Sequence, residues 1–197
     1  MLITKDTTKS AKHVAGLGWA CVTRDARHNR AMQIRDVGPS LVTLFSELVD
    51  GAPARGDAFM LNSGDPGLLR SLDTLSAADA SESAHGGATI AAHAQHVRYG
   101  LSLMNQWAAE GGNPFANAKW DEPWKISSVD AATWDEIRGG LRAEAHRWLE
   151  ALGAPRELVP AELTGMISSI AHLAYHLGAI RQINKKVRGP KEGTFPR

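Results

Sequence analysis

The sequence TIAAHAQHVRYGLSLMNQWAAE, residues 89–110, is the most regular stretch of the chain. Its apolar side chains recur at alternating spacings of four and three residues, the pattern of an amphipathic helix that packs against other helices. The positions concerned are Ile90, Ala94, Val97, Leu101, Met104 and Ala108. Gly111-Gly112-Asn113-Pro114 follows directly and predicts the end of the helix.

Three further long helices are expected on either side of this stretch. The first begins at Pro39, which suits a first turn, and ends near Gly51. The other two cover about residues 130–153, with an aspartate as the capping residue, and about residues 161–187. A short extra helix is expected over residues 66–75, because its first residues are Pro-Gly and an aspartate precedes them.

Each of these long helices has a predicted buried face. On the first it comprises Leu41, Leu44, Phe45, Leu48 and Val49. On the third it comprises Trp134, Ile137, Leu141, Ala145, Trp148 and Leu152. On the fourth it comprises Leu163, Ile167, Ile170, Ala174 and Leu177. Four amphipathic helices without strand-type alternation predict an all-α protein, a four-helix bundle with a short extra helix and two tails.

Composition and charge bound the kind of protein. The chain has 197 residues, of which 43% are hydrophobic and 22% are charged, so it can bury a core. Residues 1–35 hold seven Lys or Arg against two Asp or Glu, residues 181–197 hold six against one, and the stretch between holds nine against eighteen. An acidic body argues against a nucleic-acid partner. The single cysteine, Cys21, excludes a disulfide framework and suits the reducing cytoplasm.

No membrane segment or secretory signal is predicted. Charged residues interrupt the first twenty positions, so an apolar signal core is missing there. Residues 163–180 carry no charge, but they contain two histidines, two serines, a threonine and a tyrosine, which is too polar for a lone span. We therefore expect a cytoplasmic protein whose last long helix is buried in the bundle.

The chain is expected to divide into three parts. Residues 1–31 are basic and aperiodic, so we expect either a flexible extension or a translation start at Met32. Residues 32–187 form the bundle, and residues 188–197, which are polar with two prolines, form a tail.

The histidines indicate a metal site. His172 and His176 are four residues apart, so both side chains can reach one point beside the fourth helix. A third ligand would come from the second helix, where both His93 and His96 are available. The angular offset from the apolar seam favours His96 and leaves His93 as a neighbour. The alternative is that these histidines are packed core residues.

Small residues beside the histidine pair would let two helices approach closely enough to share an ion. On the fourth helix they form the stripe Gly165, Ser169, His172, His176 and Ala179. Because a ligating imidazole must be neutral, we expect metal binding to weaken below the usual histidine pKa of about 6.5.

Two phrases resemble the DinB-like, or YfiT-like, superfamily of metal-dependent enzymes. The phrase HLAYHLGAI, residues 172–180, resembles the last-helix signature of that family, and TIAAHAQHV, residues 89–97, resembles its second-helix segment. The resemblance implies an up-down-down-up four-helix bundle in which His96, His172 and His176 bind one divalent metal, zinc or nickel. The family members lack an extension like residues 1–31.

The resemblance also implies a function. Relatives of this fold include transferases and isomerases that use a low-molecular-weight thiol, and such a centre could equally activate water for hydrolysis. The expected partners are a small-molecule substrate and a second copy of the chain, in a homodimer. The alternative from another class is a non-catalytic metal-binding or stress-associated helical interaction protein. Trp120 and Trp124 are expected to pack in a loop or to line a pocket mouth.

Overall fold

The computed structural model describes residues 33–191, and this part of the chain is all-α with no β-strand beyond two isolated bridges. The four long helices are α1 (Ile34–Asp50), α4 (Ile90–Glu110), α5 (Ala131–Gly153) and α6 (Pro160–Ile183). The expected extension, residues 1–31, lies outside the described residues, as does all of the expected tail after residue 191.

Short helices fill the connections. Between α1 and α4 lie α2 (Gly67–Asp73) and α3 (Ala77–Ala80), and 3₁₀ turns occur at Pro114–Asn117, Pro123–Lys125 and Lys185–Val187. The sequence predicts α2 but not α3. Helix α3 forms because Ser76 and Asp79 make a reciprocal capping box, in which the Ser76 hydroxyl accepts the Asp79 N–H at 3.1 Å.

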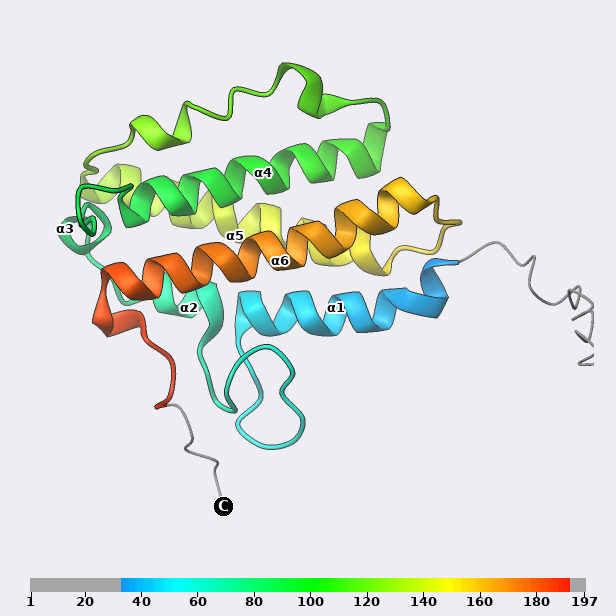
Figure 1. The fold of residues 1–197 in the computed structure, drawn as a ribbon, viewed down its shortest axis with the longest axis horizontal. Coiled ribbons are helices and arrows are strands. Elements are labelled where there is room, and N and C mark those ends of the chain that lie inside the picture. The colour runs from blue at the N-terminus through cyan, green and yellow to red at the C-terminus, as the bar shows by residue number, and fades with distance from the viewer. Residues whose placement is uncertain (1–32, 192–197) are drawn as a thin grey trace, which may run out of the picture. The chain divides into compact units, whose positions relative to one another are not determined.

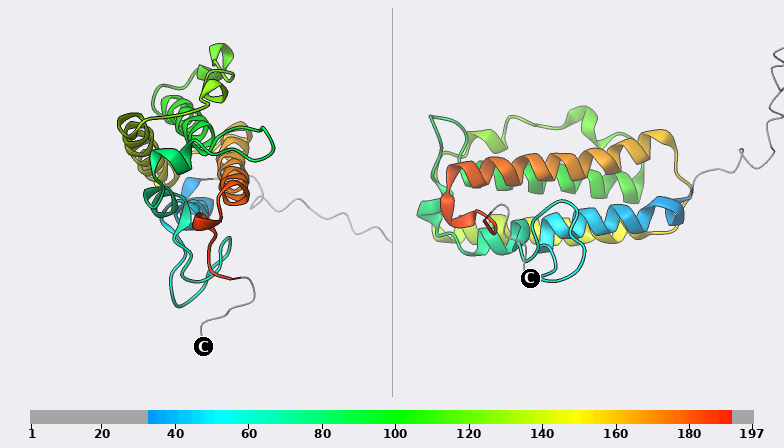
Figure 2. Two further views of the ribbon diagram at one scale, coloured as in Figure 1. Left: turned by 90° about the vertical axis from the view of Figure 1, so that its left-hand side faces the viewer. Right: turned by 60° about the horizontal axis from the view of Figure 1, so that its bottom comes forward.

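The long helices lie side by side with two directions among them. In Figure 1, α1 and α6 run one way and α4 and α5 run the other way. Helix α4 packs on α5 and α6, and α1 also packs on α5 and α6; Figure 2 shows the four axes nearly end-on. Because α4 and α5 are parallel, the connection between them, residues 111–130, must return along the length of α4.

Helix α5 buries the face that the sequence predicts. Its buried side chains are Trp134, Ile137, Leu141, Ala145, Trp148 and Leu152. The two indole N–H groups find partners inside the core: Trp134 donates to the Leu75 carbonyl and Trp148 to the Ser169 hydroxyl, both at 2.9 Å. Asp130 caps the helix, its carboxylate accepting the Thr133 N–H at 2.8 Å.

Helix α6 is rotated relative to its predicted face. Ile167 was expected inward, but 53% of its surface is exposed. The buried positions are instead Met166, Ser169, Ile170, Leu173, His176, Leu177 and Ile180. The reason is that residues 163–180 carry no charge, so periodicity had no polar face to identify. Helix α6 ends at Ile183, not at residue 187, which belongs to the following 3₁₀ turn.

Helix α1 begins five residues before Pro39, the predicted first-turn residue. Gln33 is its N-cap residue, and the Asp36 carboxylate accepts the Gln33 N–H at 3.1 Å. The Ile34 N–H is bound in turn by the Arg156 carbonyl at 2.9 Å. These bonds satisfy donors at the helix start, and the proline is accommodated inside the helix.

Within residues 33–191, no helix is both long enough and apolar enough to span a bilayer.

Candidate metal centre

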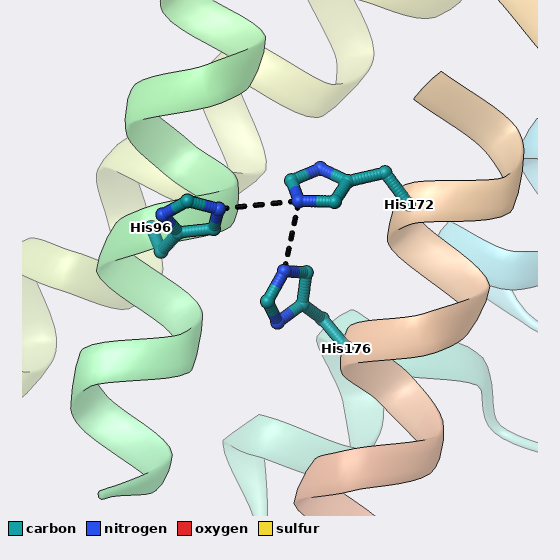
Figure 3. Close-up of side chains that lie close together, drawn as sticks. All are labelled: His96, His172 and His176. Atoms are coloured by element: carbon teal, nitrogen blue, oxygen red, sulfur yellow. Dashed lines mark hydrogen bonds between the residues drawn. The ribbon is translucent and has the colours of Figure 1, made fainter. Parts of the chain in front are cut away.

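The contact between α4 and α6 brings three histidines together. His96 projects from α4, and His172 and His176 project from α6, with their rings turned toward one another (Figure 3). One ring nitrogen from each lies within 4.8 Å of the others, the only such convergence of histidine, cysteine and carboxylate side chains among residues 33–191. The i, i+4 spacing on one helix and a close-packed neighbour produce this arrangement, as the sequence pattern suggested.

The nitrogens of His96 and His176 each lie close to the same nitrogen of His172. His172 Nε2 lies 3.1 Å from His96 Nε2 and 2.9 Å from His176 Nε2. Two nitrogens bound to one metal at about 2.1 Å are separated by about 3.0 to 3.4 Å for bond angles between a right angle and the tetrahedral value. The two separations that involve His172 therefore lie at or just below the short end of this range, and the third, between His96 and His176, is bounded at 4.8 Å. A cation would also accept lone pairs that three facing imidazole nitrogens cannot all satisfy with one another.

His93 occupies a different position from these three. Its Nδ1 lies 2.9 Å from His176 Nδ1, on the side of the His176 ring opposite Nε2. If His176 Nδ1 carries the proton, it donates to His93 Nδ1 and keeps the Nε2 lone pair aimed at the cluster. The geometry thus suits His93 to orienting His176.

Burial keeps the rings neutral. His176 is 1% exposed and His96 is 7% exposed. Burial, together with charge on His172 and the other histidines, lowers the pKa of His176 to about 3 and that of His96 to about 4. Desolvation also lowers the pKa of His93 and of His172. His96 and His176 are therefore in the ligating form well below the pH of about 6.5 expected from the sequence alone.

His172 differs from the sequence-based expectation, which placed both α6 histidines in the interior. Its side chain is exposed, whereas its neighbour one turn later is buried. The cause is the rotation of α6, which turns Ile167, Ala171 and His172 toward the surface. The centre therefore has one buried side and one side that opens outward at His172.

The long connection covers the other side of the centre with tryptophans. Trp124 stacks on His96, with ring centroids 4.4 Å apart, and lies edge-on to His93 at 5.4 Å. Trp120 lies 5.7 Å from His96. The connection is fastened beside the site, because the Tyr99 hydroxyl accepts the Lys119 N–H at 2.9 Å. Both indoles are more than a third exposed, at 38% for Trp120 and 40% for Trp124. Of the two, Trp120 lines a cleft between α4 and α6 that Trp124 does not line, so the predicted place at a pocket mouth holds for Trp120 and not for Trp124.

One buried ring nitrogen of the cluster has no hydrogen-bond partner within the described residues, and the described histidines His85 and His146 lie outside the cluster. His96 Nδ1 is buried and has no hydrogen-bond partner among residues 33–191, so the chain supplies no visible acceptor that would fix its tautomer. His146 pairs with Asp50 at 3.0 Å on the exposed surface, away from the cluster. His85 lies in a loop. His13 and His28 lie outside the described residues.

An apolar cleft adjoins the centre, and the sequence predicted only that Trp120 packs in a loop or lies at a pocket mouth. It has a volume of about 170 Å³ between α4 and α6, and His172 and Trp120 belong to its lining. Phe115 contributes a further wall from the connection, and no motif around that residue marks it in the sequence. Comparison with known proteins found no family model, curated protein or solved structure that matches the chain.

Proposed function

We propose that the chain is a metal-dependent enzyme of the DinB-like type, with an up-down-down-up four-helix bundle that holds one divalent ion, zinc or nickel. His96, His172 and His176 would bind the ion through Nε2. The observation that carries the proposal is the convergence of these three nitrogens from helices whose histidines are 76 residues apart in sequence. Three protein ligands leave coordination positions open, which is typical of catalytic sites.

The chain's own residues support such a centre in several ways. The lowered pKa values keep His96 and His176 neutral, and His93 would hold the His176 ring in the ligating tautomer when His176 Nδ1 carries the proton. Trp124 and Trp120 shield the His96 side from water, while the exposed His172 side admits a ligand. A metal bound here would lower the pKa of a bound thiol or water, which serves transfer of a low-molecular-weight thiol or hydrolysis.

The deciding experiment is elemental analysis of the full chain purified without a histidine tag. We expect about one equivalent of zinc or nickel per chain, either as purified or after reconstitution and desalting. Less than about a tenth of an equivalent after reconstitution would contradict the proposal. Metal-loaded protein would then be screened with thiol cofactors and electrophiles, and with ester and amide substrates.

A second candidate is a non-catalytic metal-binding helical interaction protein. The observation in its favour is the exposed, uncharged face of α6, where Ile167 is 53% and Tyr175 is 68% exposed. The same face would serve the homodimer that we propose. An exchangeable water on the bound metal, detected by relaxation of solvent protons with a paramagnetic ion, separates a catalytic centre from a closed structural one.

A further inference from the structure

The cleft beside His172 is lined mostly by apolar side chains, with Ser168 and Ser169 as its two hydroxyl-bearing residues. Its walls include Leu101 and Met104 from α4, Leu173 from α6, and Phe115 and Trp120 from the connection. The Ser169 hydroxyl, which also lines it, donates to the Met166 carbonyl at 2.7 Å and accepts from Trp148 at 2.9 Å. The cleft therefore offers hydrophobic contact at a point where the adjoining histidines offer metal ligation.

The size of the cleft sets the size of its occupant. Its volume is about 170 Å³. An apolar cavity of about 150 Å³ in another protein takes up benzene, so this space is sufficient for one phenyl-sized group. Small-molecule sites combine such an apolar space with a few polar or metal groups that fix orientation.

Gly100 stands at the junction between the cleft and the histidines. A Cβ atom at this position would lie 3.8 Å from Trp120 Cζ3 and 3.9 Å from His172 Cε1, which are ordinary contacts. Packing therefore does not require glycine here, although glycine inside a helix costs about 1 kcal/mol relative to alanine. Gly165 is different, because its Cβ would lie 2.7 Å from Trp107. The absence of a side chain at Gly100 keeps the space between Trp120 and His172 open.

We propose that this cleft binds a phenyl-sized apolar group of the substrate, while the polar head of the same molecule lies at His96, His172 and His176. The substrate class is then a small molecule that joins an aromatic or compact aliphatic group directly to a metal-binding head. This inference rests on the proposed metal centre and adds to it the residues that select the substrate.

The test compares two hydroxamates that share a metal-binding head and differ in the apolar group. Benzohydroxamate and acetohydroxamate are titrated into the cobalt-loaded full chain, and the visible absorption of the cobalt is followed. Burial of the phenyl ring should make benzohydroxamate bind about tenfold or more tightly than acetohydroxamate. Gly100→Leu should fill the junction and abolish this preference, and the cobalt content of the variant is measured so that only cobalt-loaded protein is compared.

Gly139→Leu is the matched control, because Gly139 is a helical glycine on α5 whose Cβ would meet nothing within 4 Å. It should keep the wild-type preference. Phe115→Ala, which removes a cleft wall away from the histidines, should reduce the preference severalfold and serves if Gly100→Leu does not fold. Equal affinities for the two hydroxamates in cobalt-loaded wild type would overturn the inference alone, as would a preference that survives both cleft variants. Failure to retain cobalt would overturn the metal centre and the inference with it.

Discussion

The two helices that pack against α4 differ in the polarity of the faces that they bury. Helix α5 buries only apolar side chains, and its outer face carries charged residues such as Glu136, Arg142 and Arg147. Helix α6 buries His176 and Ser169 among its apolar residues and leaves Ile167 exposed. The contact between α4 and α5 is apolar packing, whereas the contact between α4 and α6 combines packing with a histidine cluster and a cleft.

Helices α5 and α6 differ in how many distinct faces each one has. An amphipathic helix such as α5 has one surface to bury and one to expose to water. The surface of helix α6 meets three environments: one side packs in the core, one side faces α4 and the cleft, and one side is exposed. We attribute the absence of charged residues over residues 163–180 to these three environments.

The largest expected effect on stability comes from the α5 core. Leu141 is fully buried, so Leu141→Ala should lower the free energy of unfolding by about 3 kcal/mol, through lost burial and the cavity left behind. Urea denaturation of the metal-free protein measures this effect. Metal stoichiometry of the folded variant should be unchanged. Ile167→Ala on α6 is the comparison, and it should cost less than about 1 kcal/mol because Ile167 is 53% exposed. Equal costs would contradict the observed rotation of α6.

The next largest effect is expected from a histidine of the proposed metal site. His176→Ala removes one Nε2 from the cluster and should weaken metal affinity more than about a hundredfold. Competition with a chromophoric chelator measures the affinity. His146→Ala is the control, because His146 is exposed and paired with Asp50 outside the cluster. A similar affinity for both variants would show that the cluster is packing rather than a metal site.

A smaller effect is expected from His93. His93→Phe keeps an aromatic ring but removes the acceptor for His176 Nδ1, so metal affinity should fall about tenfold. The same chelator competition applies. A loss as large as that of His176→Ala would instead make His93 a ligand, and an unchanged affinity would remove its orienting role.

The smallest effect is a pH dependence of the metal-free protein. Above pH 7 the buried rings are neutral in both the folded and the unfolded chain, so they contribute no slope. Below about pH 6.5 His96 and His176 become protonated in the unfolded chain. They stay neutral in the folded protein, because their pKa values are lowered there to about 4 and about 3. The free energy of unfolding should therefore decrease as the pH is lowered, by about 1 kcal/mol for each of these rings between pH 7.5 and pH 6.

Urea titrations of the metal-free protein at several pH values test this dependence, with the double variant His96→Phe/His176→Phe as the comparison. The double variant should show a flatter profile over the same interval. His93 and His172 face the same cluster and contribute in the same direction, since their pKa values are also lowered. A wild-type profile that is flat from pH 7.5 to pH 5 would contradict the burial of the cluster.

Much of the fold follows from the sequence because caps and seams are local signals. Thr89 and Asp130 cap the helices that they were expected to begin or precede, and every predicted core residue of α5 is buried. The grouping of His96 with His172 and His176 also follows, from spacing and from resemblance. The exposure of His172, the pairing of His93 with His176 and the cleft at Phe115 do not follow, because each depends on helix rotation or on the path of a long connection.

The order in which the helices pack has a consequence for how the chain folds. Among the four side-by-side pairs, only α4 and α5 are successive long helices, and the pair α1–α6 joins the first to the last. Each non-successive pair must close a long loop before its contacts contribute, which raises the kinetic barrier. We expect slower folding than in a bundle of equal size whose neighbours follow one another. The histidine cluster lies between the helices of one non-successive pair, α4 and α6, so we expect it to form only after these distant segments have come together.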